Sequence, residues 1–91
     1  MFVIVVYDIS DNKRRTKMFK VMKNFGTPIQ FSAFECILKE QDFREVHEVI
    51  RAIIDPQKDK VRMYILCNSC RGGIKNMGTG KITKERNVII V

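Results

Sequence analysis

An unbroken apolar run at the start of the sequence constrains the fold more than any other feature. Phe2–Tyr7 is uncharged and mostly β-branched, which is typical of a strand that is buried on both of its faces. Successive side chains of a strand point to opposite faces of the sheet, and here both sets are apolar. The sheet that contains this strand therefore needs cover on both sides.

Further elements follow along the chain. Ser10, Asp11 and Asn12 form an N-cap cluster, and apolar residues then recur at helical spacing until Gly26 ends the helix. The periodicity next predicts a strand at 29–38, an amphipathic helix at 43–54, a strand at 61–67 and a short strand at 76–82. No repeat or Pro/Gly/Ser-rich linker interrupts the sequence, so we expect residues 1–91 to form a single domain.

The predicted order is β-α-β-α-β-β, which indicates an α+β ferredoxin-like sandwich with both helices on one face of a single sheet. The other face stays apolar, and we expect a second copy of the chain to cover it, so that the protein is a homodimer. The apolar, β-branched segment Asn87–Val91 would aggregate as a free edge. We therefore expect residues 82–91 to add a strand to a sheet, its own or, more naturally, that of the dimer partner.

The chain is basic, with 17 Lys and Arg against 10 Asp and Glu and a net charge of +7. This excess favours a polyanionic partner such as nucleic acid. The basic residues of the first predicted helix are the best candidates to bind it: Lys13, Arg14, Arg15, Lys17 and Lys20. Three of these, the lysines, share one helical line that suits a phosphate backbone, although a simple solvated helix face is the alternative.

Membrane insertion and cysteine chemistry are not indicated. No apolar run approaches the roughly 20 residues that span a bilayer, and the initial run lacks the basic region of a signal peptide, so we expect a cytoplasmic protein. Cys67 and Cys70 have the spacing of a CxxC pair, but Cys36 and His47 lie in unrelated places and cannot complete a zinc site. Reduced thiols are the expectation.

Asp8 stands at the carboxyl end of the first predicted strand, where it could carry chemistry. A carboxylate can bind a hard cation such as magnesium, but one carboxylate is too few for a stable site. In a two-fold dimer the two copies of Asp8 could share one ion. A strand-end turn residue or a helix-capping acid is the alternative. Arg14 lies on the apolar line of the first helix and is expected to point toward the sheet and Asp8.

Several motifs, taken in order, resemble a known family. They are Tyr7–Asp11 (YDISD), Lys13–Lys17 (KRRTK), Gly26, Gln30–Cys36 (QFSAFEC) and Val61–Cys67 (VRMYILC). In this order they resemble the small CRISPR-associated protein of the spacer-acquisition module, the partner of the CRISPR integrase, and the resemblance extends over nearly the whole chain. The resemblance implies a ferredoxin-like homodimer in antiviral defence, a magnesium-dependent endonuclease that acts on single-stranded RNA or double-stranded DNA.

The resemblance also implies site residues. Asp8 matches the family's aspartate that binds magnesium at the dimer axis. Arg14 or Arg15, and Phe34, match positions near the scissile phosphate. Many relatives carry arginine where this chain has Pro28, so one cation of the family's site is missing here. This difference favours the alternative reading, a non-catalytic dimeric scaffold that binds DNA and bridges integrase subunits.

Overall fold

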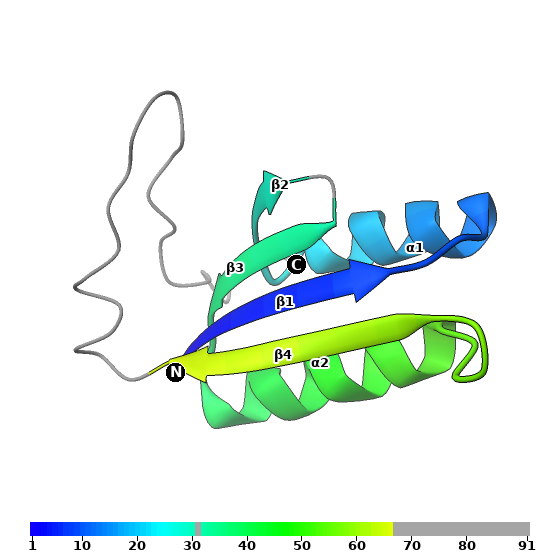
Figure 1. The fold of residues 1–91 in the computed structure, drawn as a ribbon. Coiled ribbons are helices and arrows are strands. Elements are labelled where there is room, and N and C mark those ends of the chain that lie inside the picture. The colour runs from blue at the N-terminus through cyan, green and yellow to red at the C-terminus, as the bar shows by residue number, and fades with distance from the viewer. Residues whose placement is uncertain (31, 67–91) are drawn as a thin grey trace.

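The computed structural model describes residues 1–30 and 32–66. In this part the chain forms, in order, β1 (Phe2–Asp8), α1 (Asn12–Met22), β2 (Gly26–Gln30), β3 (Ala33–Ile37), α2 (Glu40–Ile53) and β4 (Lys60–Leu66), shown in Figure 1. The strand expected at 76–82, the strand expected within 82–91 and the CxxC pair all lie outside the described residues. Neither of the two described helices has the length and apolar character needed to cross a bilayer.

The strands of the described part form one antiparallel sheet in the order β2-β3-β1-β4, which places the first strand in the middle. Both helices cover the same face of this sheet (Figure 1). The architecture confirms the predicted α+β ferredoxin-like class.

The predicted order of elements is wrong in one respect. Residues 29–38, expected as one strand, belong to the β2–β3 hairpin, so the described order is β-α-β-β-α-β. The chain reverses between Gln30 and Ala33, which are register partners. No glycine, asparagine or proline separates these two residues, so the sequence lacks the usual signal of a hairpin turn.

α1 begins at its predicted cap and ends earlier than predicted. The Asp11 carboxylate accepts a hydrogen bond from the backbone N–H of Arg14 at 2.9 Å, which satisfies a free donor of the first turn. The last helical residue is Met22, and Gly26 is the first residue of β2 rather than the end of the helix. A Cβ atom at Gly26 would overlap the carbonyl oxygen of Glu35, so the close approach of β2 to β3 requires glycine at this position.

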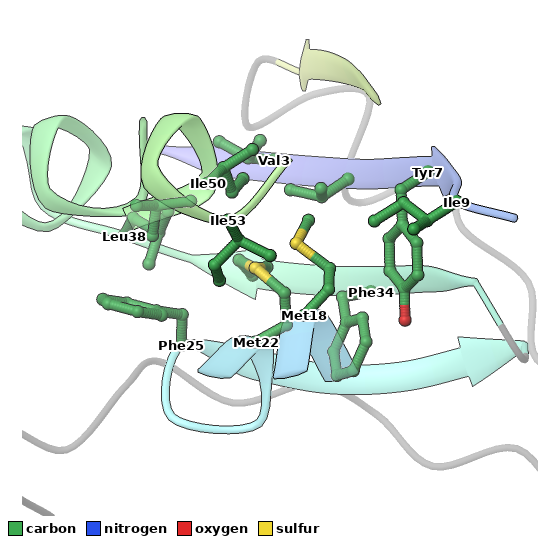
Figure 2. Packing of buried hydrophobic residues seen from close by; sticks show 13 residues of the cluster. Val3, Tyr7, Ile9, Met18, Met22, Phe25, Phe34, Leu38, Ile50 and Ile53 are labelled. Carbon is green, nitrogen blue, oxygen red and sulfur yellow. The ribbon is translucent and has the colours of Figure 1, made fainter. Parts of the chain in front are cut away.

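The core lies between the sheet and the two helices (Figure 2). β1 contributes Val3, Val5 and Tyr7 to it, all nearly or completely buried. The other elements supply Met18, Met22, Phe25, Phe34, Cys36, Leu38, Val46, Ile50 and Ile53. Helix-facing side chains of the sheet and the apolar faces of α1 and α2 thus form one continuous cluster.

The other side of the sheet, which we call the open face, carries the alternate residues of the strands. By register these are Phe2, Ile4, Val6 and Asp8 of β1, Ala33, Glu35 and Ile37 of β3, and Lys60, Arg62, Tyr64 and Leu66 of β4. Val6 is 38% exposed and Tyr64 is 46% exposed. As predicted, β1 is apolar toward both faces, and neither described helix covers the open face (Figure 1). The homodimer itself stays a prediction.

Candidate functional site

Asp8 is the last residue of β1, and alternation along the strand puts its side chain on the open face, away from the helices. Its register partner in β4 is Lys60, and both side chains are exposed. Neither side chain forms a hydrogen bond or an ion pair with any residue in the described part of the chain. No residue of this described part therefore occupies the Asp8 carboxylate.

One chain offers only part of a metal site. Within residues 1–30 and 32–66, no three His, Cys, Asp or Glu side chains gather closely enough to hold an ion. Magnesium prefers oxygen ligands, and the Asp8 carboxylate supplies oxygens of that kind. The donor chemistry therefore fits magnesium, but the remaining ligands have to come from water, from a substrate or from a second copy of Asp8.

Arg15 holds the loop that connects Asp8 to α1. Its guanidinium donates hydrogen bonds to the carbonyl oxygens of Ile9 at 3.1 Å and Ser10 at 3.3 Å, and it also bonds to the side-chain oxygen of Asn12. These bonds tie the two residues after Asp8 to the first turn of the helix. The described contacts of Arg15 are therefore to the backbone after Asp8 and to Asn12, and its role near a phosphate stays a prediction.

Arg14 does not pair with Asp8 as predicted. Its Nε donates to one carboxylate oxygen of Asp59 at 2.8 Å, and its second guanidinium nitrogen donates to the other oxygen at 3.1 Å. Arg14 does point inward from α1, but the carboxylate that it meets lies in the loop before β4. The helical line of the sequence gives the direction of this side chain and not its partner.

Asp59 was not among the site residues predicted from the sequence. It is the most buried carboxylate of the described part, and its side chain has no exposed surface. It also accepts a hydrogen bond from the backbone N–H of Asp55 at 2.8 Å. The hydrogen bond from Arg14, supported by that of the Asp55 backbone, holds the pKa of Asp59 below its usual value despite burial. This bridge fixes the start of α1 to the start of β4, on either side of the Asp8 end of β1. An isolated acid in a polar loop carries no periodic signal, so only the fold reveals it.

Phe34 lies on the helix side of the sheet, opposite the face that carries Asp8. Its ring is completely buried between Tyr7, at 6.4 Å between centroids, and Phe19, which it meets edge-on at 5.4 Å. The structure therefore does not bring Phe34 together with Asp8, and the ring has no exposed surface for a phosphate. Burial raises the pKa of the Tyr7 phenol, and the nearby charge of Arg15 only partly opposes that effect.

The predicted lysine line is present on α1. Lys13, Lys17 and Lys20 are all exposed and, with Asn12 and Thr16, line a shallow hollow on the outer surface of the helix. We call this line the helix stripe. It lies in the helix layer, whereas Asp8 lies on the open face.

Cys36 and Pro28 have structural positions and no reactive group near Asp8. Cys36 lies in the core, and burial raises the pKa of its thiol to about 12, which keeps it protonated and unreactive. Pro28 lies in β2 and is in register with Phe34 of β3, two strands away from β1 in the sheet.

Known proteins share both the sequence and the fold. The family described as CRISPR associated protein Cas2 matches residues 1–74. A CRISPR-associated endoribonuclease Cas2 of Chloroflexus aurantiacus is 44% identical over 66 residues, which cover 72% of this chain and 71% of that protein. A CRISPR-associated endonuclease Cas2 of Thermus thermophilus is 31% identical over 87 residues, which cover 96% of this chain and 92% of that protein.

The crystal structure of Streptococcus pyogenes Cas2 superimposes with a TM-score of 0.76 at 28% identity. That match covers 86% of this chain and all of the Streptococcus chain, so the hairpin and the central position of β1 belong to a shared fold. The family match spans every element described above, from β1 to the end of β4. From its sequence and its fold alike, the chain belongs to the CRISPR-associated protein Cas2 family.

Proposed function

We propose that this protein acts in CRISPR adaptation as a homodimeric, magnesium-dependent endonuclease that hydrolyses phosphodiester bonds of single-stranded RNA or double-stranded DNA and works with the CRISPR integrase. The observation that carries the proposal is the Asp8 carboxylate at the end of the central strand, which is exposed and has no partner among residues 1–30 and 32–66. The relatives named above as endoribonuclease and endonuclease support the same class of reaction.

The open face supports the homodimer. Val6 lies two residues before Asp8 and is its neighbour on the same face of β1. Both Val6 and Tyr64 are exposed on this face. Apolar surface of this kind is stabilised when a second sheet covers it. An isologous contact centred near β1 would bring the two copies of Asp8 to the same two-fold axis, which would complete the half-site of one chain.

The residues of the chain then have separate tasks. Asp8 would hold magnesium, which when bound supplies charge neutralisation at the phosphodiester and orientation of a water molecule. Arg15 fixes the loop after Asp8, and the Arg14–Asp59 bridge fixes the two segments beside it. The exposed helix stripe would bind the phosphate backbone, where each contact adds salt-dependent affinity.

The test of the proposal compares wild type with Asp8→Asn, which keeps the size of the side chain and removes its charge. We expect Asp8→Asn to lose cleavage of labelled RNA and DNA by at least about 100-fold, since one charged ligand of the ion is removed. EDTA should abolish wild-type cleavage, and added magnesium should restore it. Cleavage that survives both Asp8→Asn and EDTA would contradict the proposal.

A second candidate function, the non-catalytic scaffold, is favoured by Pro28, an uncharged residue at a position where the family resemblance implies arginine. In that case Asp8→Asn should support spacer acquisition in cells as well as wild type does. Charge reversal of the helix stripe at Lys13 and Lys17 should abolish acquisition. The nuclease proposal requires the first of these variants to fail, so the two functions give opposite results.

A further inference from the structure

The edge strand β4 presents two cations beside Asp8. Lys60 is the register partner of Asp8, and Arg62 is the register partner of Val6, so both side chains belong to the open face. Both are exposed. Residues two apart on a strand are about 6.6–6.8 Å apart, so the two cations follow each other along the edge of the face at that spacing.

Neither Lys60 nor Arg62 forms an ion pair within the described part of the chain. The ammonium of Lys60 has no ion-pair or hydrogen-bond partner there, and its cross-strand neighbour Asp8 is not close enough to form one. The neighbouring Tyr64 side chain raises the pKa of Arg62, so the guanidinium keeps its charge. The guanidinium carries five N–H donors, so donors remain for a ligand.

Asp8 and the magnesium that it would hold act at one phosphodiester, and a fixed cation on the same surface would add attraction for the neighbouring phosphates of the backbone. The helix stripe lies in the layer on the other side of the sheet. Arg14 is occupied by Asp59, and Pro28 carries no charge. Lys60 and Arg62 are the cations that share a face with Asp8 in the described part of the sheet.

We propose that Lys60, with Arg62 behind it, binds the phosphate backbone of the nucleic acid next to Asp8. This inference rests on the proposed function, because it assigns residues to the same site. Among the described strands β4 lies at the edge, so its side chains lie at the margin of the open face rather than at its centre on β1.

The experiment measures binding without cleavage. All variants are made in the Asp8→Asn background with EDTA present, and fluorescence anisotropy gives the Kd for one labelled sequence as single-stranded RNA, single-stranded DNA and duplex DNA. We expect Lys60→Glu to weaken binding at least tenfold for one or more of these ligands. Lys60→Ala should reduce the slope of log Kd against log salt by about 1, and Lys60→Arg should retain binding.

Lys39→Glu is the matched control, since Lys39 is an exposed lysine at the other end of the sheet, beside the register partners Phe2 and Ile37. It makes the same change of charge and should weaken binding much less. Equal losses in Lys60→Glu and Lys39→Glu would overturn the proposal, because they would show an effect of net charge alone. Unchanged binding of Lys60→Glu to all three ligands would also overturn it, whatever the cleavage result for Asp8→Asn in the wild-type background.

Discussion

The two faces of the sheet are made by the same strands and have different properties. On β1, Val3, Val5 and Tyr7 are packed under the helices, whereas Val6 and Asp8 between and after them are exposed. On β4 the exposed residues of the open face include Lys60 and Arg62. Most of the buried apolar surface lies on the helix side, so the open face can carry charges that would be costly in a core.

The first prediction tests whether the helix side of the sheet contributes more stability than the open face, by truncating one apolar side chain on each. Phe34→Ala should lower the free energy of unfolding by about 3–5 kcal/mol, since it deletes a completely buried ring that packs on Tyr7 and Phe19. Val6→Ala on the open face should cost each protomer at most about 1 kcal/mol. Urea titrations at several protein concentrations measure both. A loss for Phe34→Ala no larger than that for Val6→Ala would mean that the helix side does not hold most of the stability.

The second prediction concerns the close approach of β2 to β3. Gly26→Ala should destabilise the protein by about 1–3 kcal/mol, because its Cβ atom would overlap backbone of β3 at Glu35. Thr27→Ala, at the next position of the same strand, is the control and should cost less. Thermal unfolding followed by circular dichroism compares the two. A Gly26→Ala protein as stable as wild type would show that the hairpin moves freely against the rest of the sheet.

The third and smallest effect depends on pH. Asp59→Asn should lower Tm at neutral pH, because the ionised carboxylate is stabilised by Arg14 and the Asp55 N–H. The pKa of Asp59 is lowered in the folded state, so its contribution is complete above the unfolded pKa of about 4 and is lost as the pH falls through the lower folded value. The Tm difference between wild type and variant should therefore be constant from about pH 7 to 5 and shrink below about pH 4.

Asp11→Asn is the control for this series. Asp11 also lies near Arg14, at 3.9 Å, but it is exposed, and asparagine caps a helix about as well as aspartate. This variant should change Tm little at any pH. If Asp11→Asn and Asp59→Asn gave the same pH dependence, the buried bridge would have no special role in fixing the segments beside Asp8.

The regular elements could be predicted from the sequence because each has a strong local signal. The apolar run of β1, the cap at Asp11 and the helical periodicity of α2 all act over a few residues. The β2–β3 turn could not be predicted, because no glycine, asparagine or proline lies between Gln30 and Ala33 to signal a reversal of the chain. The sequence also singled out Asp8, from its place at the end of the first strand, and the helix stripe, from the spacing of its lysines along one helical line.

The partners of those residues depend on tertiary structure. Arg14 and Asp59 are 45 positions apart in the sequence. Lys60 lies beside Asp8 because the register of β1 and β4 makes them cross-strand neighbours. A helical line predicts that Arg14 points inward, but the loop that it meets is set by the packing of α2. For the same reason, Phe34 shares a motif with site residues of the family and yet lies in the core.

The strand order has a consequence for synthesis on the ribosome. β1 is made first but lies between β3 and β4, so one of its edges stays unpaired until residues 60–66 have emerged. Until then the nascent chain displays the backbone of Phe2–Tyr7 along a free edge, a surface on which other chains can add. The long separation between β1 and β4 also adds loop-closure cost, which slows folding. Emergence of β4 is therefore the step that protects this chain from aggregation as it is being made.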